Sequence, residues 1–215
     1  PISGKTYRKF LPYGRIHSRE NALCPGSLSL ERHRLLWLFL QERTDFFTTK
    51  KRMLHVAPEQ CFIDLFRKQK NLDYTTGDLF SPLADVKMDI HAIPFEENTF
   101  DVLFCNHVME HVADDLQCMK EVYRVLKPGG FAILQVPSNY ARETTYEDNS
   151  IVGPKEREQA FGQDDHVREY GLDYGDILRK SGLTVREDHF LETLSVEERT
   201  RYALPSQEII YFCTK

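Results

Sequence analysis

FDVLFC, the stretch at residues 100–105, predicts a strongly apolar β-strand at the centre of a sheet. Working outward from it, short apolar runs alternate with helical segments, which is the rhythm of β-α-β units. Further strands are predicted at 53–56, 72–76, 85–88 and 131–136, and helices at 59–68 and 114–127. The second helix has one apolar face, and Pro128-Gly129-Gly130 is expected to end it. The pattern predicts an α/β fold with a doubly wound, mostly parallel sheet.

The N-terminal region has weaker signals. Residues 1–27 mix Pro, Gly and basic residues without periodicity, which indicates an irregular arm. An amphipathic helix is predicted at 29–42, with Ser27 or Ser29 as its cap. The basic cluster at 32–34 within it is interpreted as a partly solvated helix start, although contact with an anion or substrate is an alternative.

The C-terminal third begins with a polar segment, residues 138–168, that has little periodicity and is interpreted as a substrate-side loop or lid. A helix is predicted at 172–181, and strands at 183–190 and 208–213. Between those strands, Ser195 and Glu198 have the spacing of a capping box, which predicts a short helix.

Length and composition favour one soluble domain. The 215 residues are 41% hydrophobic, enough for one core. The net charge of −5 gives no long-range attraction for nucleic acid or an anionic membrane, and no apolar run is long enough to span a membrane. The five cysteines are widely spaced with no Cys-x-x-Cys pair, so neither disulfides nor a zinc ribbon is indicated and a cytoplasmic location is expected.

Polar residues follow three successive predicted strands. Asp78 stands 21 positions after Ala57 in the first turn, close to the spacing at which an acidic residue binds a nucleotide's ribose hydroxyls. Asp89 follows the third strand, and Asn106 with His107 follows the fourth. Ligands of open parallel sheets bind at the edge where the strands' carboxyl ends meet. These residues therefore predict a slot shaped for a nucleoside.

Four segments carry a family resemblance: 89–95, 98–102, 108–112 and 121–130. Together they resemble the class I S-adenosylmethionine-dependent methyltransferases, in their small-molecule, type 11-like branch. The resemblance implies a Rossmann-like, seven-stranded sheet with an antiparallel last strand. The resemblance extends over residues 53 to about 190, and we expect one methyltransferase domain over 1–215. Its parts are an N-terminal arm and helix at 1–50, a cofactor-binding core at 51–137, and a substrate-side loop with C-terminal strands at 138–215.

The same resemblance implies S-adenosylmethionine as the cofactor and assigns roles by position. Asp78 would bind the ribose, Leu79 the adenine face, Asp89 with Ile90 the adenine edge, and Asn106 with His107 the methionine moiety.

The first turn departs from the family, which usually has an acidic residue and a Gly-x-Gly loop there. This chain has His55, Ala57 and Pro58 there, which are candidates for cofactor binding, with a structural role as the alternative for His55. Glu59 follows them and is expected to pair with the cofactor's ammonium group. The N-terminal leader resembles a bacterial subgroup in which a Cys-Pro-x-Cys segment is expected. Only Cys24 of that pair is present, so no metal is expected.

Candidates for catalysis and for substrate binding remain open. His107 and His166 are candidates for a general base, and Arg168 with His166 for contact with the acceptor. The alternatives are a structural histidine at 107 and a solvated charged face around 166–168. Glu110 and His111 are interpreted as structural, with a position facing the substrate as the alternative.

The favoured function is methyl transfer from S-adenosylmethionine to a small-molecule acceptor, through oxygen, nitrogen or carbon, by direct displacement without a metal. The sequence identifies neither the acceptor nor the oligomeric state. The alternative is a non-catalytic binding or scaffold protein with a degenerate cofactor loop. A nicotinamide-dependent oxidoreductase is disfavoured, because no Gly-x-Gly-x-x-Gly turn follows the first strand.

Overall fold

The computed structural model describes residues 10–13 and 19–215, and its contacts divide the chain into two compact units. We call residues 51–58, 73–187 and 211–215 the sheet unit, and residues 1–50, 59–72 and 188–210 the helical unit. The domain predicted over 1–215 stays a prediction. Within the described ranges, no helix combines the length and the apolar character that crossing a membrane requires.

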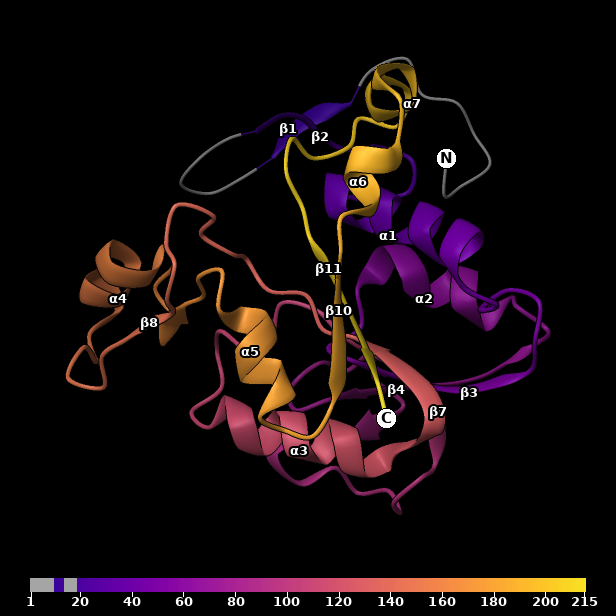
Figure 1. The fold of residues 1–215 in the computed structure, drawn as a ribbon, viewed down its shortest axis with the longest axis horizontal. Coiled ribbons are helices and arrows are strands. Elements are labelled where there is room, and N and C mark those ends of the chain that lie inside the picture. The colour runs from indigo at the N-terminus through magenta and orange to yellow at the C-terminus, as the bar shows by residue number, and fades with distance from the viewer. Residues whose placement is uncertain (1–9, 14–18) are drawn as a thin grey trace. The chain divides into compact units, whose positions relative to one another are not determined.

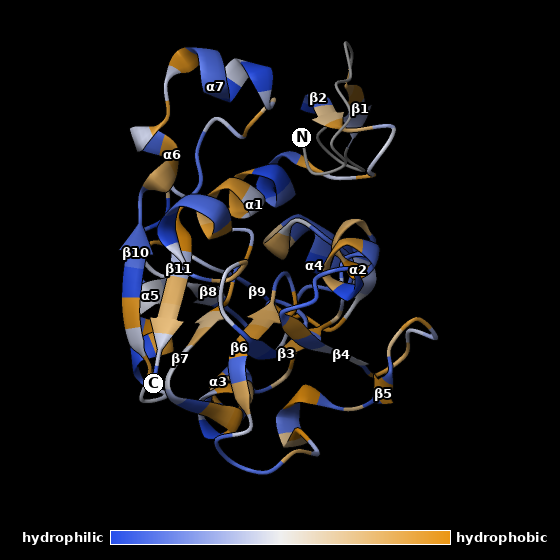
Figure 2. Cartoon of the chain, turned by 90° about the vertical axis from the view of Figure 1, so that its right-hand side faces the viewer, coloured by the Kyte–Doolittle hydropathy of each residue, from blue (hydrophilic) through white to orange (hydrophobic). Residues whose placement is uncertain are grey.

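A seven-stranded sheet forms the sheet unit (Figure 1), in the order β10-β11-β7-β6-β3-β4-β5, which can be followed in Figure 2. Its strands are β3 (Lys51–Val56), β4 (Leu72–Asp78), β5 (Val86–Lys87), β6 (Phe100–Cys105), β7 (Leu126–Ile133), β10 (Thr184–Asp188) and β11 (Ile210–Thr214). β6 pairs in parallel with β3 and β7, whereas β11 is antiparallel to β7. The predicted α/β fold, seven-stranded and mostly parallel with an antiparallel last strand, is confirmed.

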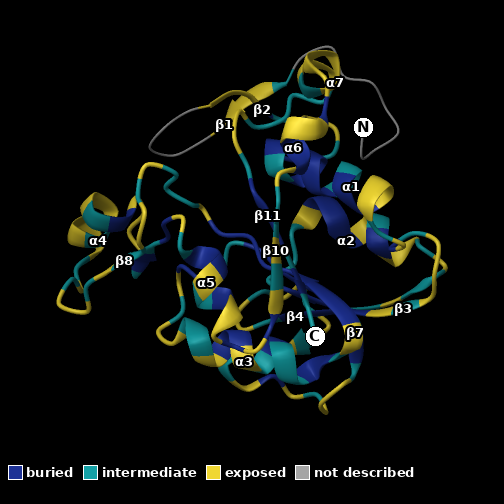
Figure 3. Cartoon of the chain, viewed as in Figure 1, coloured by how far each residue is buried: buried dark blue, intermediate teal, exposed yellow. Residues whose placement is uncertain are grey.

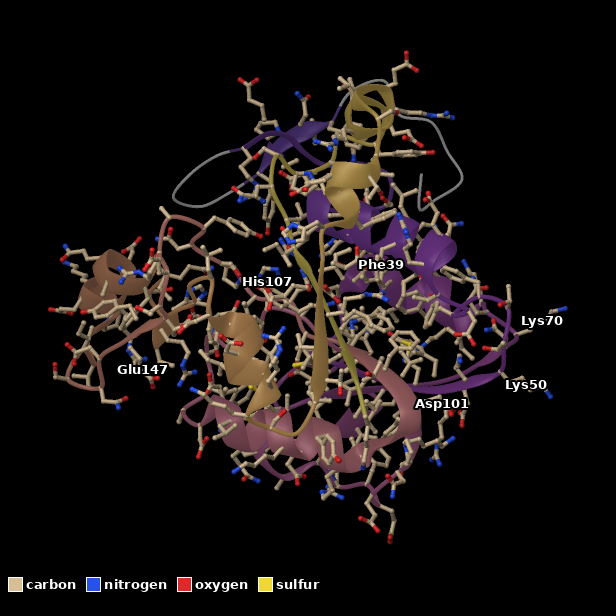
Figure 4. All side chains as sticks on the ribbon, in the orientation of Figure 1. Phe39, Lys50, Lys70, Asp101, His107 and Glu147 are labelled. Carbon is tan, nitrogen blue, oxygen red and sulfur yellow. The ribbon has the colours of Figure 1, made fainter. Side chains whose placement is uncertain are left out.

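The central strand β6 explains why the sheet is ordered this way. All of its residues except Asp101 are buried, as is typical of a strand covered on both faces. Much of the neighbouring strand β7 is also buried, as its dark blue colour shows in Figure 3. Asp101 marks the solvated start of the strand, where it accepts hydrogen bonds from Lys127 Nζ at 2.9 Å and from the Arg52 N–H at 2.8 Å. The opposite, carboxyl end of β6 leads into Asn106 and His107, so both residues lie at the carboxyl edge of the sheet. His107 is labelled in Figure 4.

The helix before β7 begins and ends as its sequence predicts. In α3 (Asp115–Val125), the side chain of Asp114 accepts a hydrogen bond from the Gln117 N–H at 2.9 Å, which caps the first turn. The buried face of α3 carries Val122 and Val125, and the helix packs against β7 and α5 (Tyr174–Arg179).

The start of β7 was predicted wrongly. The strand begins at Leu126, directly after the helix, instead of at Phe131. Phe100 pairs with Leu126 and Val102 with Phe131, so Pro-Gly-Gly forms an irregularity inside the strand. A Cβ atom at Gly130 would lie 2.9 Å from the Asp101 carbonyl oxygen, which explains why glycine is needed there.

The segment 138–168, which the sequence analysis interprets as a loop or lid, has regular secondary structure. It contains β8 (Tyr146–Glu147), which pairs antiparallel with β9 (Arg168–Glu169), and α4 (Pro154–Phe161). Pro at the first position of α4 and Gly162 at its end, with φ 88°, are ordinary helix boundary signals. The proposed lid role of this segment stays a prediction.

The helical unit contains β1 (Leu11–Tyr13), β2 (Arg19–Leu23), α1 (Glu31–Arg43), α2 (Gln60–Arg67), α6 (Phe190–Thr193) and α7 (Val196–Arg201). β1 and β2 form an antiparallel pair, so the prediction of an irregular arm was wrong for these residues. Its other parts, 1–9 and 14–18, lie outside the described residues. Ser195 and Glu198 do form the predicted capping box at the start of α7, with the Ser195 N–H donating to Glu198 Oε2 at 2.9 Å.

The start of α1 differs from its prediction in two ways. The cap residue is Leu30 instead of Ser27 or Ser29, and its N–H donates to His33 Nδ1 at 3.0 Å. The predicted partly solvated basic cluster is largely buried, because Arg34 is only 4% exposed. Its guanidinium donates to the carbonyl oxygens of Ser29 at 2.7 Å and Ala203 at 2.6 Å, so Arg34 is a structural residue.

Candidate functional site

Two residues at the carboxyl edge of the sheet adopt a left-handed backbone without being glycine. Ala57, after β3, has φ 47°, and His107, after β6, has φ 55°. Hydrogen bonds hold both, from the Ala57 N–H to the Gly77 carbonyl at 2.9 Å and from the His107 N–H to the Gln135 carbonyl at 2.7 Å. Such conformations cost free energy and concentrate at functional sites. Ala57 therefore takes the turn that glycine usually allows.

Asp78 ends β4 and organises the turn that follows. One of its carboxylate oxygens, Oδ1, accepts the N–H groups of Phe80 at 2.7 Å and Ser81 at 2.6 Å. The next residues are unusually open for apolar side chains, with Leu79 39% and Phe80 88% exposed. The turn thus presents a carboxylate beside exposed apolar surface at the sheet edge.

Asp89 follows β5 and caps the short 3-10 helix η1 (Ile90–Ala92). Its Oδ1 accepts hydrogen bonds from the His91 N–H at 2.9 Å and from His91 Nδ1 at 2.7 Å. These bonds lower the pKa of Asp89, so the half-exposed carboxylate stays ionised at neutral pH. Ile90 is buried beside it.

An acid-base pair on α3, missed in the sequence, holds the loop after η1. Glu121 accepts the Ile93 N–H at 2.8 Å, and Arg124 donates to the carbonyl oxygens of Phe95 at 2.7 Å and Ile93 at 2.8 Å. The two side chains also pair with each other at 2.7 Å, and the hydrogen bond from Arg124 lowers the pKa of Glu121. Their three-residue spacing on one helix face was the available signal.

Two predicted cofactor residues are buried in the sheet unit. Asn106 is 4% exposed and accepts the Gln135 N–H at 3.3 Å. His55 is fully buried within β3, where its Nδ1 lies 2.8 Å from the Tyr74 hydroxyl. Both side chains therefore have structural partners at the edge of the sheet or within it.

Glu59 and Pro58 fall on either side of the division between the two units. Pro58 ends the first segment of the sheet unit. Glu59, in the helical unit, is the residue before α2, and its carboxylate lies 3.5 Å from His33 Nε2. The structure thus provides a protein partner for the carboxylate that was predicted to bind the cofactor's ammonium group.

Arg168 is 1% exposed, and its guanidinium makes all of its hydrogen bonds within the protein. It donates to the carbonyl oxygens of Met109 at 2.7 Å, Val112 at 2.6 Å and Ala113 at 3.1 Å. Glu147 takes the remaining two bonds, from Nε at 3.5 Å and Nη2 at 2.9 Å, so all five N–H groups have acceptors. We therefore interpret Arg168 as a brace for the segment after β6, in place of the predicted contact with the acceptor.

The two candidate bases lie around one buried carboxylate, that of Glu110, which is 1% exposed. His107 Nδ1 is 3.4 Å and His111 Nε2 3.9 Å from Glu110 Oε1. The rings of His166 and His111 pack in a T-shaped arrangement, with ring centroids 4.7 Å apart. Burial lowers the pKa of His166, so this imidazole is neutral at neutral pH and can accept a proton.

Glu110, His111 and His166 also offer one ligand atom each within 4.8 Å of one another. From the sequence, Glu110 and His111 were interpreted as structural, and the cluster was not predicted. The only local signal was the spacing of His107, Glu110 and His111 on one short segment.

The sequence is similar to a known protein family and to several characterised proteins. Residues 49–134 match the family described as "Methyltransferase domain". Cycloartenol-C-24-methyltransferase 1 of Oryza sativa subsp. japonica is 48% identical over 44 residues, which are 20% of this chain and 13% of that protein. Demethylmenaquinone methyltransferase of Geobacillus sp. is 46% identical over 52 residues, 22% of each chain. The chain thus matches less than a quarter of the length of either relative.

Solved structures share the fold. The 1,6-didemethyltoxoflavin-N1-methyltransferase of Burkholderia thailandensis, determined with S-adenosylhomocysteine, superposes with a TM-score of 0.57 at 14% identity. The match covers 86% of this chain and 77% of that one. At this identity the likeness concerns the fold alone.

Proposed function

We propose, from the premise that residues 49–134 are a class I S-adenosylmethionine-dependent methyltransferase domain of the type 11 branch, that the chain methylates a small-molecule acceptor. The observation that carries the proposal is the left-handed turn at Ala57, beside Asp78 and Asp89 at the ends of neighbouring strands. Fit to the cofactor rests on this turn, which keeps the backbone conformation that the missing glycine would supply. Relatives named for methylating demethylmenaquinone and didemethyltoxoflavin support a small molecule as acceptor.

Each strand end has its own task in this proposal. Asp78 uses Oδ1 to hold its turn and offers Oδ2 to the ribose hydroxyls. Leu79 packs against the adenine, and Asp89, kept ionised by His91, accepts a hydrogen bond from the adenine amine while Ile90 supports its position. The clamp formed by Glu121 and Arg124 keeps the apolar loop after η1 in place.

S-adenosylmethionine supplies an activated methyl group on a sulfonium, so the protein mainly has to align the acceptor and exclude water. Where the acceptor loses a proton, His166 is the proposed base, because its Nε2 bears the free lone pair. The bond from sulfur to methyl breaks as the bond from the nucleophile to methyl forms, and S-adenosylhomocysteine leaves. His107 borders the methionine end through its position after β6.

The test is cofactor affinity in a variant that preserves the turn. Asp78→Asn keeps an oxygen acceptor at Oδ1 but removes the charge, and we expect S-adenosylhomocysteine to bind about 10- to 100-fold more weakly, as for loss of a charged hydrogen bond. Asp148→Asn is the matched control, because Asp148 Oδ1 likewise accepts the Ser150 N–H at 2.9 Å in an exposed turn. Equal affinity in both variants and the parent would reject the assigned role of Asp78.

The alternative, a non-catalytic binding protein, is favoured by the Glu59 contact with His33, which engages a group expected to bind the cofactor. A screen of hydroxylated and amine small molecules for production of S-adenosylhomocysteine separates the two functions. Cofactor binding without turnover of any acceptor would favour the binding protein.

A further inference from the structure

The carboxylate of Glu110 is poorly compensated for a buried charge. Its side chain is 1% exposed, and neither oxygen has a hydrogen-bond partner of good geometry among residues 10–13 and 19–215. Burying a carboxylate in this way is costly unless positive charge lies beside it. His107 Nδ1, at 3.4 Å from Glu110 Oε1, lacks the geometry of a hydrogen bond, and His111 Nε2, at 3.9 Å, is too distant for one.

His166 presents a bare nitrogen to the same cluster. Its Nδ1 lies 3.1 Å from the carbonyl oxygen of Phe161, which can only accept a hydrogen bond. Nδ1 therefore carries the proton, and Nε2 is left with its lone pair. His166 is 3% exposed, and within the described chain its Nε2 is buried without a hydrogen bond.

His111 is oriented in a similar way. Its Nδ1 lies 3.4 Å from Asp165 Oδ2, while its Nε2 faces Glu110. Metal-binding histidines ordinarily donate the N–H of the second ring nitrogen to a carboxylate or a carbonyl oxygen, which directs the other nitrogen at the metal. Asp165 has this position for His111, and the Phe161 carbonyl has it for His166.

We propose that Glu110, His111 and His166 bind one divalent transition-metal ion of the Zn²⁺ type. Two imidazoles and one carboxylate are donors that Zn²⁺ accepts while keeping a further position for water or another ligand. Mg²⁺ and Ca²⁺ are disfavoured, because they prefer oxygen ligands. His111 is 34% exposed at its side chain, which gives the ion an approach from solvent to the two buried ligands.

The distances fit a site that tightens on binding. One atom from each residue lies within 4.8 Å of those of the other two. In a tetrahedral site with bonds of about 2.1 Å, donor atoms are about 3.4 Å apart, so side-chain movements of about 1 Å suffice. His107, through its contact with Glu110 Oε1, holds the carboxylate from the side of β6.

A simple ion pair is the competing explanation. A protonated His107 or His111 beside Glu110 would balance the buried charge, but it would leave Nε2 of His166 without a function. The metal accounts for both the carboxylate and this nitrogen. The inference goes beyond the proposed methyl transfer and replaces the sequence-based expectation of no metal. A metal ion bound to Nε2 takes the lone pair of His166, so the metal-bound His166 no longer serves as the general base proposed above.

The experiment is a calorimetric titration of metal-free, tag-free protein with ZnCl2, without cofactor. We expect one ion per chain, with affinity at least 100-fold weaker in Glu110→Gln and in His166→Ala, since loss even of an outer partner costs about 10- to 100-fold. His189→Ala is the matched control, because His189 Nδ1 is paired with Glu192 Oε1 at 3.2 Å on the surface and should leave the titration unchanged. Circular dichroism verifies that each variant folds.

Co²⁺ provides a second measurement that needs no variant. The wild-type chain should give the intense visible absorption bands of a cobalt ion in a four-coordinate site with nitrogen and oxygen ligands. Absence of stoichiometric binding of Zn²⁺ and Co²⁺, or unchanged affinity in folded Glu110→Gln and His166→Ala, would overturn the proposal. Because the titrations omit S-adenosylmethionine, such a failure would leave the proposed methyl transfer untouched.

Discussion

Replacing Arg168 tests whether it braces the fold or meets the acceptor. Arg168→Met keeps the aliphatic stem but removes the donors to Met109, Val112 and Ala113, which are bonded at 2.6 to 3.1 Å. Each charged hydrogen bond contributes about 1.5–3 kcal/mol, but the bonds are not additive. Breaking a buried ionic network by removing one partner typically costs about 3–5 kcal/mol, which we expect as the loss in free energy of unfolding.

The assay is urea unfolding followed by far-ultraviolet circular dichroism. Arg142→Met is the matched control, because Arg142 pairs with Glu169 at 3.0 Å but is 39% exposed, and we expect a loss below about 1 kcal/mol. A loss of less than about 1 kcal/mol in Arg168→Met would refute the brace. An accompanying large rise in KM for the acceptor would then return Arg168 to the substrate site.

Three further changes test local features of the sheet unit. Ala57→Gly should stabilise the chain by about 0.5–1 kcal/mol, because relief of the left-handed strain at φ 47° exceeds the entropy that glycine adds to the unfolded state; a lower melting temperature would contradict this. Gly130→Ala should cost about 1–3 kcal/mol in urea unfolding, since its Cβ would lie 2.9 Å from the Asp101 carbonyl oxygen, and an unchanged midpoint would show that the strand shifts freely. Glu121→Gln should cost about 1–2 kcal/mol at pH 7. The pKa of Glu121 is lower in the folded chain, so its charge stabilises the fold fully above the unfolded pKa of about 4.3 and less as the pH falls through the folded pKa. The difference in free energy of unfolding between parent and variant should therefore narrow in acid. A difference that does not depend on pH would contradict the ion pair.

Apolar patterning predicted the sheet well where the local sequence and the fold agree. The strand at 100–105 matches β6, because a strand buried on both faces must be apolar throughout. Pro128-Gly129-Gly130 predicted the start of β7 too late, because a strong helix stop does not reveal that the strand has already begun. The helix at Pro154–Phe161 was missed because its polar face shows almost no periodicity, although Pro and Gly mark its ends.

The candidate site was only partly predictable. Asp78 and Asp89 do lie at strand ends, as the sequence predicts, while their contact with the cofactor stays a prediction. The burial of Arg34 and Arg168 was not predicted, because their carbonyl acceptors come from distant segments and carry no sequence signal. His166 likewise joins Glu110 only through the fold, so no spacing rule links them.

The central claim is that this chain binds the methyltransferase cofactor despite its altered first turn. Isothermal titration of the wild-type protein with S-adenosylhomocysteine tests it most directly. Saturable binding with one ligand per chain is the expected result. The claim would be contradicted if no binding heat were seen at ligand concentrations that should saturate a site formed by Asp78 and Asp89. The chain would then be interpreted as a non-catalytic binding protein.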